Sequence, residues 1–330
     1  MSEEREIGLN DSDPQKIVQK VDNNALIKQS SPDFSDSVKD LTDANDLLEE
    51  ILRKGESELI PWETMKLPSE GFYYDNAIPN GIIKIRAMGI EAEKILATSR
   101  LAQSGQSIDY LFNHCCEFPN DFDPLNLLTG DRMFMLYVLR GITHGNIYEF
   151  MVTCPNKDCK LSSTHQYDLN MLSETIQGPD PSLGKEPFRV SLPYISKVMG
   201  KDVWVNVRFL RGKDITSMAT RDKFNKRAVP AAPRTERQVR NEVNAGSSID
   251  QTITDNLSMV IESVMGVQNK MKIEQFINKL HSSDTSTIRE FIKDKSPGID
   301  SMVIVTCPNC RLENRMELPI TEGFFRPAKS

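Results

Sequence analysis

The sequence predicts an α+β protein that is mostly helical, with a small mixed sheet and a zinc-ribbon-like pair of cysteine hairpins. Apolar residues recur at helical intervals over most of residues 247–300, which predicts packed amphipathic helices. Short segments such as residues 203–210 alternate apolar and polar residues and predict strands. Four of the six cysteines form two short pairs, and both pairs open with Val-Thr-Cys-Pro-Asn.

The composition narrows the class of protein. The 330 residues carry a net charge of −7, which argues against a general nucleic-acid binder, since such proteins are usually basic. No apolar run approaches the ~20 residues of a membrane span, so we expect no membrane contact. The start of the chain lacks a basic and then apolar signal segment. We therefore expect a reducing cytoplasm, where paired cysteines indicate metal ligands rather than disulfides.

Residues 1–58 predict a flexible acidic N-terminal arm. They contain 15 Asp or Glu and seven Lys or Arg, with little hydrophobic periodicity. Such a segment buries too little apolar area to offset the entropy of ordering it. Residues 38–53 differ, because their leucines and isoleucines recur at helical intervals and Thr42 can cap a helix. This stretch predicts a short helix that is transient or docks on a partner or on the chain's own core.

Residues 59–176 predict an α/β region that contains the first cysteine hairpin. Residues 82–88 alternate as a strand does, and residues 107–117 and 123–141 have helical patterns. The second of these helices is expected to start at Asp123-Pro124, an N-cap followed by proline. The first cysteine turn lies between predicted strands at 148–153 and 162–169.

Residues 177–225 predict a strand and a helix, and residues 226–246 predict a flexible basic linker. Residues 177–190 read as a loop, residues 203–210 as a strand and residues 213–227 as a helix. Between Arg221 and Arg240 there are seven basic and two acidic residues. This linker is either a solvated loop or a clamp for an acidic partner.

Residues 247–300 predict a helical region, and residues 301–330 predict the second cysteine hairpin and an aromatic C-terminal end. The expected helices cover 250–264, 270–280 and 285–295, the last capped by Ser283-Asp284. Strands at 301–306 and 313–318 enclose the second cysteine turn.

The two cysteine pairs predict one structural zinc site. Cys154 and Cys159 lie on one turn and Cys307 and Cys310 on another, and four thiolates complete the tetrahedron that zinc prefers. Protein ligands would then fill every position, so no bound water could be activated. Other interpretations remain open: two turns without metal, or half-sites completed across a subunit interface or by His165.

The sequence shows no set of catalytic residues. It has no phosphate loop, nucleophile elbow or metalloprotease motif. Cys115 and Cys116 follow His114 on a predicted helix; we expect buried thiols, with a Cys–His nucleophile as the alternative. We therefore predict a protein that is not an enzyme and has no small-molecule substrate.

Three stretches resemble one known family. These are the opening Leu-Pro-Ser-Glu-Gly-Phe-Tyr-Tyr at residues 67–74, the late Cys-Pro-Asn-Cys turn at 307–310, and Phe-Phe-Arg-Pro at 324–327. In this order they resemble the baseplate hub and hub-assembly proteins of T-even-type contractile-tailed phages. The resemblance implies a bacteriophage tail baseplate hub subunit or hub assembly factor. It also implies other tail and baseplate proteins as partners, in the virion or in the host bacterial cytoplasm during assembly.

The C-terminal aromatic residues are candidate partner-binding residues. Phe324, Phe325 and Arg326 lie close to the chain end, and aromatic and arginine side chains are common interface anchors. They either insert into a neighbouring subunit or pack onto the chain's own core.

A nucleic-acid-binding zinc-ribbon accessory protein is the alternative function. That function predicts basic residues around the cysteine turns. Lys157 and Lys160 are offset by Asp158 in the first turn, and the second turn is similarly balanced. The sequence alone therefore argues against nucleic acid as a partner and favours the baseplate function.

Overall fold

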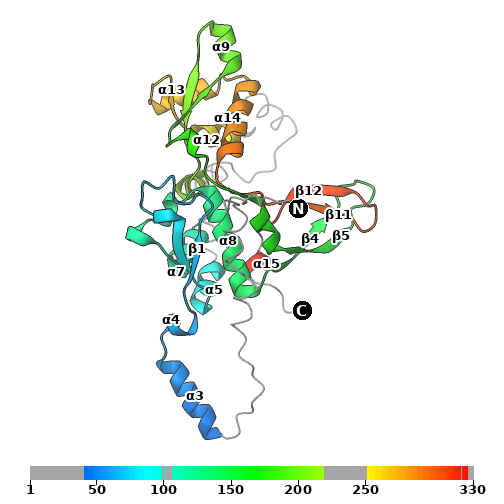
Figure 1. The fold of residues 1–330 in the computed structure, drawn as a ribbon. Coiled ribbons are helices and arrows are strands. Elements are labelled where there is room, and N and C mark those ends of the chain that lie inside the picture. Colours follow the sequence, from blue (N-terminus) through cyan, green and yellow to red (C-terminus); the bar gives the residue numbers. More distant parts are fainter. Residues whose placement is uncertain (1–40, 99–100, 102–105, 219–250, 321, 326–330) are drawn as a thin grey trace, which may run out of the picture. The chain divides into compact units, whose positions relative to one another are not determined.

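The computed structural model describes residues 41–98, 101, 106–218, 251–320 and 322–325 (Figure 1). The chain divides into two compact units, Met1–Leu59 and Ile60–Ser330. The predicted α+β class is confirmed, but the small mixed sheet is not. The described strands instead form separate antiparallel sheets of two or three strands. Residues 1–40, the predicted basic linker at 226–246 and Arg326 lie outside the described residues.

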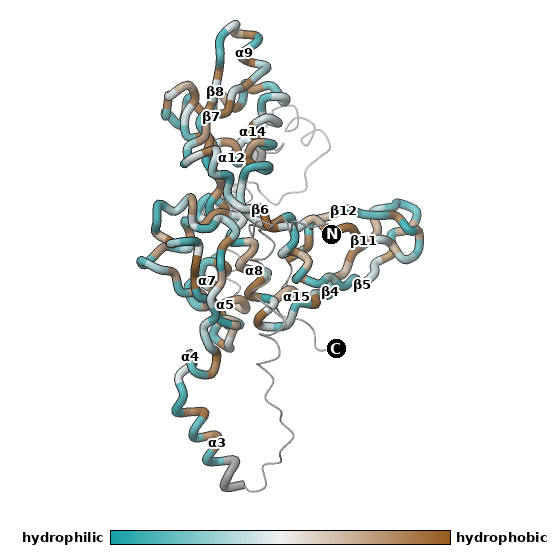
Figure 2. The backbone as a smooth tube through the Cα atoms, in the orientation of Figure 1, coloured by the Kyte–Doolittle hydropathy of each residue, from teal (hydrophilic) through white to brown (hydrophobic). Residues whose placement is uncertain are grey.

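The first unit contains α3 (Leu41–Arg53) and α4 (Glu56–Leu59). The predicted helix is present from Leu41 onward, and Thr42 lies within it rather than at its cap. Glu49–Arg53 at 3.0 Å and Glu50–Lys54 at 3.2 Å form ion pairs four residues apart. Hydrophobic and hydrophilic residues alternate along α3 in Figure 2, and the exposed hydrophobic side chains are Leu47, Leu48, Ile51 and Leu52.

A three-stranded sheet begins the second unit. It orders β1 (Glu63–Lys66), β2 (Ile82–Ile85) and β3 (Cys116–Glu117). The side chains of Ile83 and Ile85 are buried while their neighbours in β2 face outward, so the alternation predicted the strand correctly. The strand ends at Ile85, three residues earlier than expected.

Three helices cover this part of the chain: α5 (Ile90–Ala97), α7 (Ser107–Cys115) and α8 (Thr129–His144). The predicted helix at 123–141 begins later than expected. Asp123 does cap a helix, since its carboxylate accepts from the Leu125 N–H at 2.9 Å, but this is a short 3₁₀ helix at Pro124–Asn126. Leu128 then adopts extended backbone because it forms a β-bridge with Arg211, and α8 can start only after it.

A buried carboxylate on α8 holds the turn that follows β1. Asp131 is fully buried and accepts hydrogen bonds from the Ser69 N–H at 2.9 Å, the Ser69 hydroxyl and the Tyr74 hydroxyl. The Tyr74 hydroxyl in turn accepts from the Leu128 N–H at 2.9 Å. Burial raises the pKa of Asp131 from 3.8 to about 6. The Asp131 side chain thus attaches residues 67–74 to α8.

A second three-stranded sheet orders β7 (Phe188–Ser191), β8 (Trp204–Val207) and β9 (Ile261–Val264). The predicted helix at 250–264 is therefore too long. The helix α12 (Gln251–Val260) ends where Ile261 pairs with Val207 of β8. Pairing with β8 makes residues 261–264 a strand, although their sequence continues the helical pattern. Residues 212–218 are helical, and the rest of the helix predicted at 213–227 lies outside the described residues.

The predicted loop at 177–190 is more structured than expected. It includes a 3₁₀ helix at Pro181–Leu183 and the first residues of β7. Its first residue belongs to β6 (Ile176–Gln177), which pairs with β10 (Gly298–Ile299). The backbone at the start of β10 passes so close to α8 that a Cβ on Gly130 would lie 2.0 Å from the carbonyl oxygen of Pro297, the residue before β10. Only glycine fits there without movement of the backbone.

Three further helices are α9 (Pro193–Met199), α13 (Lys270–Ile277) and α14 (Ser282–Lys295). Asp284 was expected to cap α14 and does not. Nδ1 of His281 takes that place by accepting from the Ser283 N–H at 3.1 Å. Asp284 is buried and accepts from the N–H groups of Tyr194 and Ile195 at 2.9 and 3.0 Å, so it caps α9 instead.

The C-terminal aromatic residues belong to the core. Figure 1 shows α15 (Glu322–Phe325) beside α8 and β4 (Ile147–Thr153). Phe324 is fully buried, with its ring centroid 4.9 Å from that of Tyr148 and 5.5 Å from that of Tyr137. Phe325 is also buried, and its carbonyl oxygen lies 2.9 Å from Nε2 of His144. Insertion of these two rings into a neighbouring subunit does not fit side chains that the chain itself buries.

None of the helices in the described part of the chain combines the length and hydrophobicity needed to cross a membrane.

The buried carboxylate generates a pH prediction. The folded-state pKa of Asp131, about 6, exceeds the ordinary value of 3.8, so its contribution to stability falls as pH rises from about 4 to about 6 and is constant above that. The difference between these two pKa values corresponds to about 3 kcal/mol of unfolding free energy. Urea unfolding of the wild type and Asp131→Asn across this range should show the wild type losing stability relative to the variant. A difference in unfolding free energy between the two proteins that stays constant with pH would contradict this prediction.

The buried aromatic end generates a stability prediction. Phe324→Ala should lower the free energy of unfolding by about 3–5 kcal/mol, because it removes a fully buried ring. Tyr110→Ala is the matched control, since Tyr110 is an aromatic residue that is half exposed. The control should change stability by about 0.5 kcal/mol or less. Unchanged stability of Phe324→Ala together with failed particle assembly would restore the partner-anchor interpretation.

Candidate metal centre

Two hairpins carry the predicted metal ligands. The first pairs β4 with β5 (Ser162–Asp168), and the second pairs β11 (Met302–Thr306) with β12 (Glu313–Glu317). These bounds agree with the predicted strands to within a residue or so. Alternate residues of each hairpin are buried: Phe150 and Val152 in β4, and Val303 and Val305 in β11. Each cysteine pair follows directly after the last paired residue of its strand.

The two cysteine turns close in the same way although their lengths differ. The Cys154 N–H donates to the Leu161 carbonyl at 2.8 Å, and the Cys307 N–H donates to the Leu312 carbonyl at 3.0 Å. The residue after the second cysteine has a positive φ in both turns, +46° at Lys160 and +58° at Arg311.

The first turn has two extra residues, which fold back within it. Oδ1 of Asn156 accepts from the Asp158 N–H at 3.0 Å, and the Asn156 carbonyl accepts from the Cys159 N–H at 3.0 Å. The wider spacing therefore does not prevent the first turn from presenting its sulfurs as the second does.

The structure brings all four predicted cysteines together. Their Sγ atoms lie within 4.8 Å of one another. Among the described residues, these four side chains form a group that could hold a metal ion. Cys154 Sγ lies 3.5 Å from Cys310 Sγ, and Cys159 Sγ lies 3.8 Å from Cys307 Sγ. A tetrahedron with metal–sulfur bonds of about 2.3 Å has edges of about 3.8 Å, whereas a disulfide bond is about 2.05 Å long. The described cysteines form no disulfide, and the spacing fits one tetrahedral ion.

The electrostatics of the cluster suit a cation. The backbone N–H groups of Cys310 and Asn309 lower the pKa of the Cys307 thiol to about 7. Although the Asn156 N–H acts in the opposite direction, burial and the neighbouring thiols raise the pKa of Cys154 to about 12. Four thiols this close share protons in hydrogen bonds, and a divalent cation can replace those protons.

Asn309 is a site residue that sequence reasoning missed. Its Nδ2 lies 3.2 Å from Cys159 Sγ, a sulfur of the opposite turn. Both turns contain Cys-Pro-Asn, so the sequence signalled a role for the asparagines, but it could not show that only one of them reaches across.

His165 and the other cysteines lie elsewhere. His165 Nε2 is 2.8 Å from the Ser163 hydroxyl, and His165 is not a member of the four-ligand group. Cys115 and Cys116 are buried, as expected. Burial raises the pKa of the Cys116 thiol well above its usual value, which opposes formation of a nucleophilic thiolate.

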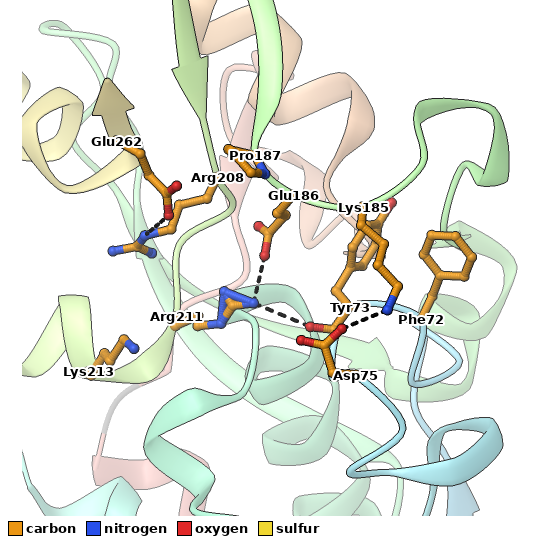
Figure 3. A pocket seen from close by; sticks show the side chains of 10 residues that line it. All are labelled: Phe72, Tyr73, Asp75, Lys185, Glu186, Pro187, Arg208, Arg211, Lys213 and Glu262. Atoms are coloured by element: carbon orange, nitrogen blue, oxygen red, sulfur yellow. Dashed lines mark hydrogen bonds and ion pairs between the residues drawn. The ribbon is translucent and has the colours of Figure 1, made fainter. Parts of the chain in front are cut away.

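A hollow of about 300 Å³ lies apart from the cysteines and is lined by charged side chains (Figure 3). Its charges largely compensate one another, and an ionic ligand would have to compete with these pairs. The ion pairs are Lys185–Asp75 at 2.7 Å, Arg211–Glu186 at 2.6 Å and Arg208–Glu262 at 3.6 Å.

Comparison with known proteins gives one result. A family model described as T4 bacteriophage base plate protein matches residues 71–326, which covers well over half of the chain and both cysteine hairpins. No match was found among curated proteins or among solved structures. The match confirms the resemblance seen in the sequence motifs. The chain belongs to the family of T4 bacteriophage base plate proteins.

Proposed function

We propose that the chain is a non-enzymatic subunit or assembly factor of the baseplate hub, in which a structural Zn²⁺ joins the two cysteine hairpins. The observation that supports it is the cluster of four sulfurs, in a chain whose family is that of base plate proteins. Its partners are other tail and baseplate proteins, and its place is the tail baseplate of the virion or the host cytoplasm during assembly.

Zinc is the metal that the donor set favours. Thiolates are soft ligands, and four of them in a tetrahedral arrangement are typical of structural zinc or iron–sulfur sites. The S–S contacts of 3.5 and 3.8 Å fit a single ion. With Cys154, Cys159, Cys307 and Cys310 as ligands, the ion has no open position for a substrate or a water, so its contribution is to folding.

The metal would connect segments that are distant in the sequence. Cys159 and Cys307 are 148 residues apart, and their sulfurs meet across the cluster. A structural zinc contributes on the order of 10 kcal/mol of apparent binding energy, which is comparable to the whole stability of a typical domain. The ion would therefore determine whether the two hairpins stay together.

The charges around the turns do not favour the nucleic-acid alternative. Arg315 lies 3.8 Å from Asp300 and belongs to a strand that also carries Glu313 and Glu317, so the second hairpin presents no basic stripe. The basic segment at 221–240 lies outside the described residues and gives no support in either direction.

Metal analysis tests the zinc centre. Protein purified without chelator should contain about one zinc per chain, and Cys307→Ser should lose the zinc and show a large drop in melting temperature. Thr306→Ser is the matched control, because Thr306 is an exposed residue of the same strand and should keep both properties. Metal-free wild type, or Cys307→Ser with a full zinc content, would contradict the proposal.

Mass spectrometry of purified phage particles tests the place of the protein. A hub subunit should be present in finished particles. An assembly factor should be absent from particles but co-purify with tail proteins from infected cells. Absence from both preparations would rule out either form of the proposed function.

A further inference from the structure

The asparagines of the two Cys-Pro-Asn turns have different partners. In the first turn, Oδ1 of Asn156 accepts from the Asp158 N–H at 3.0 Å, so this side chain stabilises its own turn. In the second turn, Nδ2 of Asn309 points out of its own turn and donates to Cys159 Sγ at 3.2 Å. The two asparagines therefore make different hydrogen bonds although they occupy equivalent positions of the two turns.

The sulfur that Asn309 contacts belongs to the more exposed ligand of the first turn. Cys154 and Cys307, the first cysteines of their turns, are the two buried ligands, and backbone N–H groups of their own turns donate to their sulfurs. Cys159 ends the longer turn and is only partly buried. The Leu161 N–H of its own turn donates to its sulfur as well, and Asn309 adds a donor from the opposite turn. A thiolate accepts hydrogen bonds, and an amide donor fixes its orientation towards the ion.

We propose that Asn309 is a positioning residue of the metal centre: its carboxamide orients the Cys159 sulfur and ties the longer turn to the shorter one. The inference rests on the proposed function insofar as it needs a bound metal. Its consequence is that Asn309 slows metal release by keeping the most exposed ligand of the first turn in place. Loss of such an outer hydrogen bond typically costs 10–100-fold in metal affinity.

Zinc release from the full-length protein provides the first test. Zinc transfer to excess chelator should be about 10–100-fold faster in Asn309→Ala than in the wild type. Asn309→Asp should be at least as fast, because a carboxylate repels the thiolate and cannot donate to it. Asn156→Ala is the matched control: it removes a hydrogen bond of the first turn without removing the donor to Cys159.

Cobalt substitution provides a readout that simple loosening of the fold does not change. With Co²⁺ in place of zinc, the sulfur-to-cobalt charge-transfer bands report on the electron density of the bound sulfurs. These bands should shift in Asn309→Ala and Asn309→Asp and stay in place in Asn156→Ala.

The outcomes separate this inference from the zinc proposal. A wild type that binds neither zinc nor cobalt overturns the metal centre itself. A wild type that holds metal, with an unchanged release rate and spectrum in Asn309→Ala, overturns only the role of Asn309. Equal acceleration in Asn156→Ala and Asn309→Ala, without a spectral shift, would assign the effect to turn stiffness and also overturn it.

Discussion

The contact among four cysteine sulfurs is the constraint on which the arrangement of the second unit depends. It joins the two ends of a long segment of the chain, since Cys159 precedes and Cys307 follows the entire sheet formed by β7, β8 and β9. The segments before and after this sheet also contact each other directly, because β6 pairs with β10. The Thr175 hydroxyl accepts from the Asp300 N–H at 3.2 Å and donates to the Asp300 carbonyl at 3.1 Å. The sulfur cluster adds a further connection between the two ends of this segment.

Buried carboxylates make comparable long-range connections elsewhere. Asp131 of α8 binds Ser69, 62 residues earlier, and Asp284 of α14 binds the start of α9, about 90 residues earlier. In both cases an anion that would be costly to bury is satisfied by N–H and O–H donors of another segment. A chain of modest hydrophobic content, 38%, therefore relies on specific polar contacts as well as on its core.

These contacts explain which features the sequence could predict. The strands around the cysteines follow from local alternation and local turn chemistry, and they were predicted almost to the residue. Three of the differences share one cause, which is that a distant segment decides the local structure. Asp284 resembles a cap of its own helix but serves α9. Ile261 continues a helical pattern but pairs with Val207. Asn309 resembles a turn residue but bonds a sulfur 150 positions away. None of these partners can be inferred from neighbouring residues.

The aromatic C-terminal end follows the second cysteine turn for a physical reason. Two attachments hold the hairpin of β11 and β12. Its turn is held by the sulfur cluster. Just beyond its base, the Pro319 carbonyl accepts from the Tyr148 hydroxyl at 2.8 Å, and Phe324 packs on the same tyrosine ring. Tyr148 lies near the start of β4, and Cys154 follows its end. One hairpin is thus attached to the other at both ends, by the cluster of cysteine sulfurs at one end and by aromatic packing at the other.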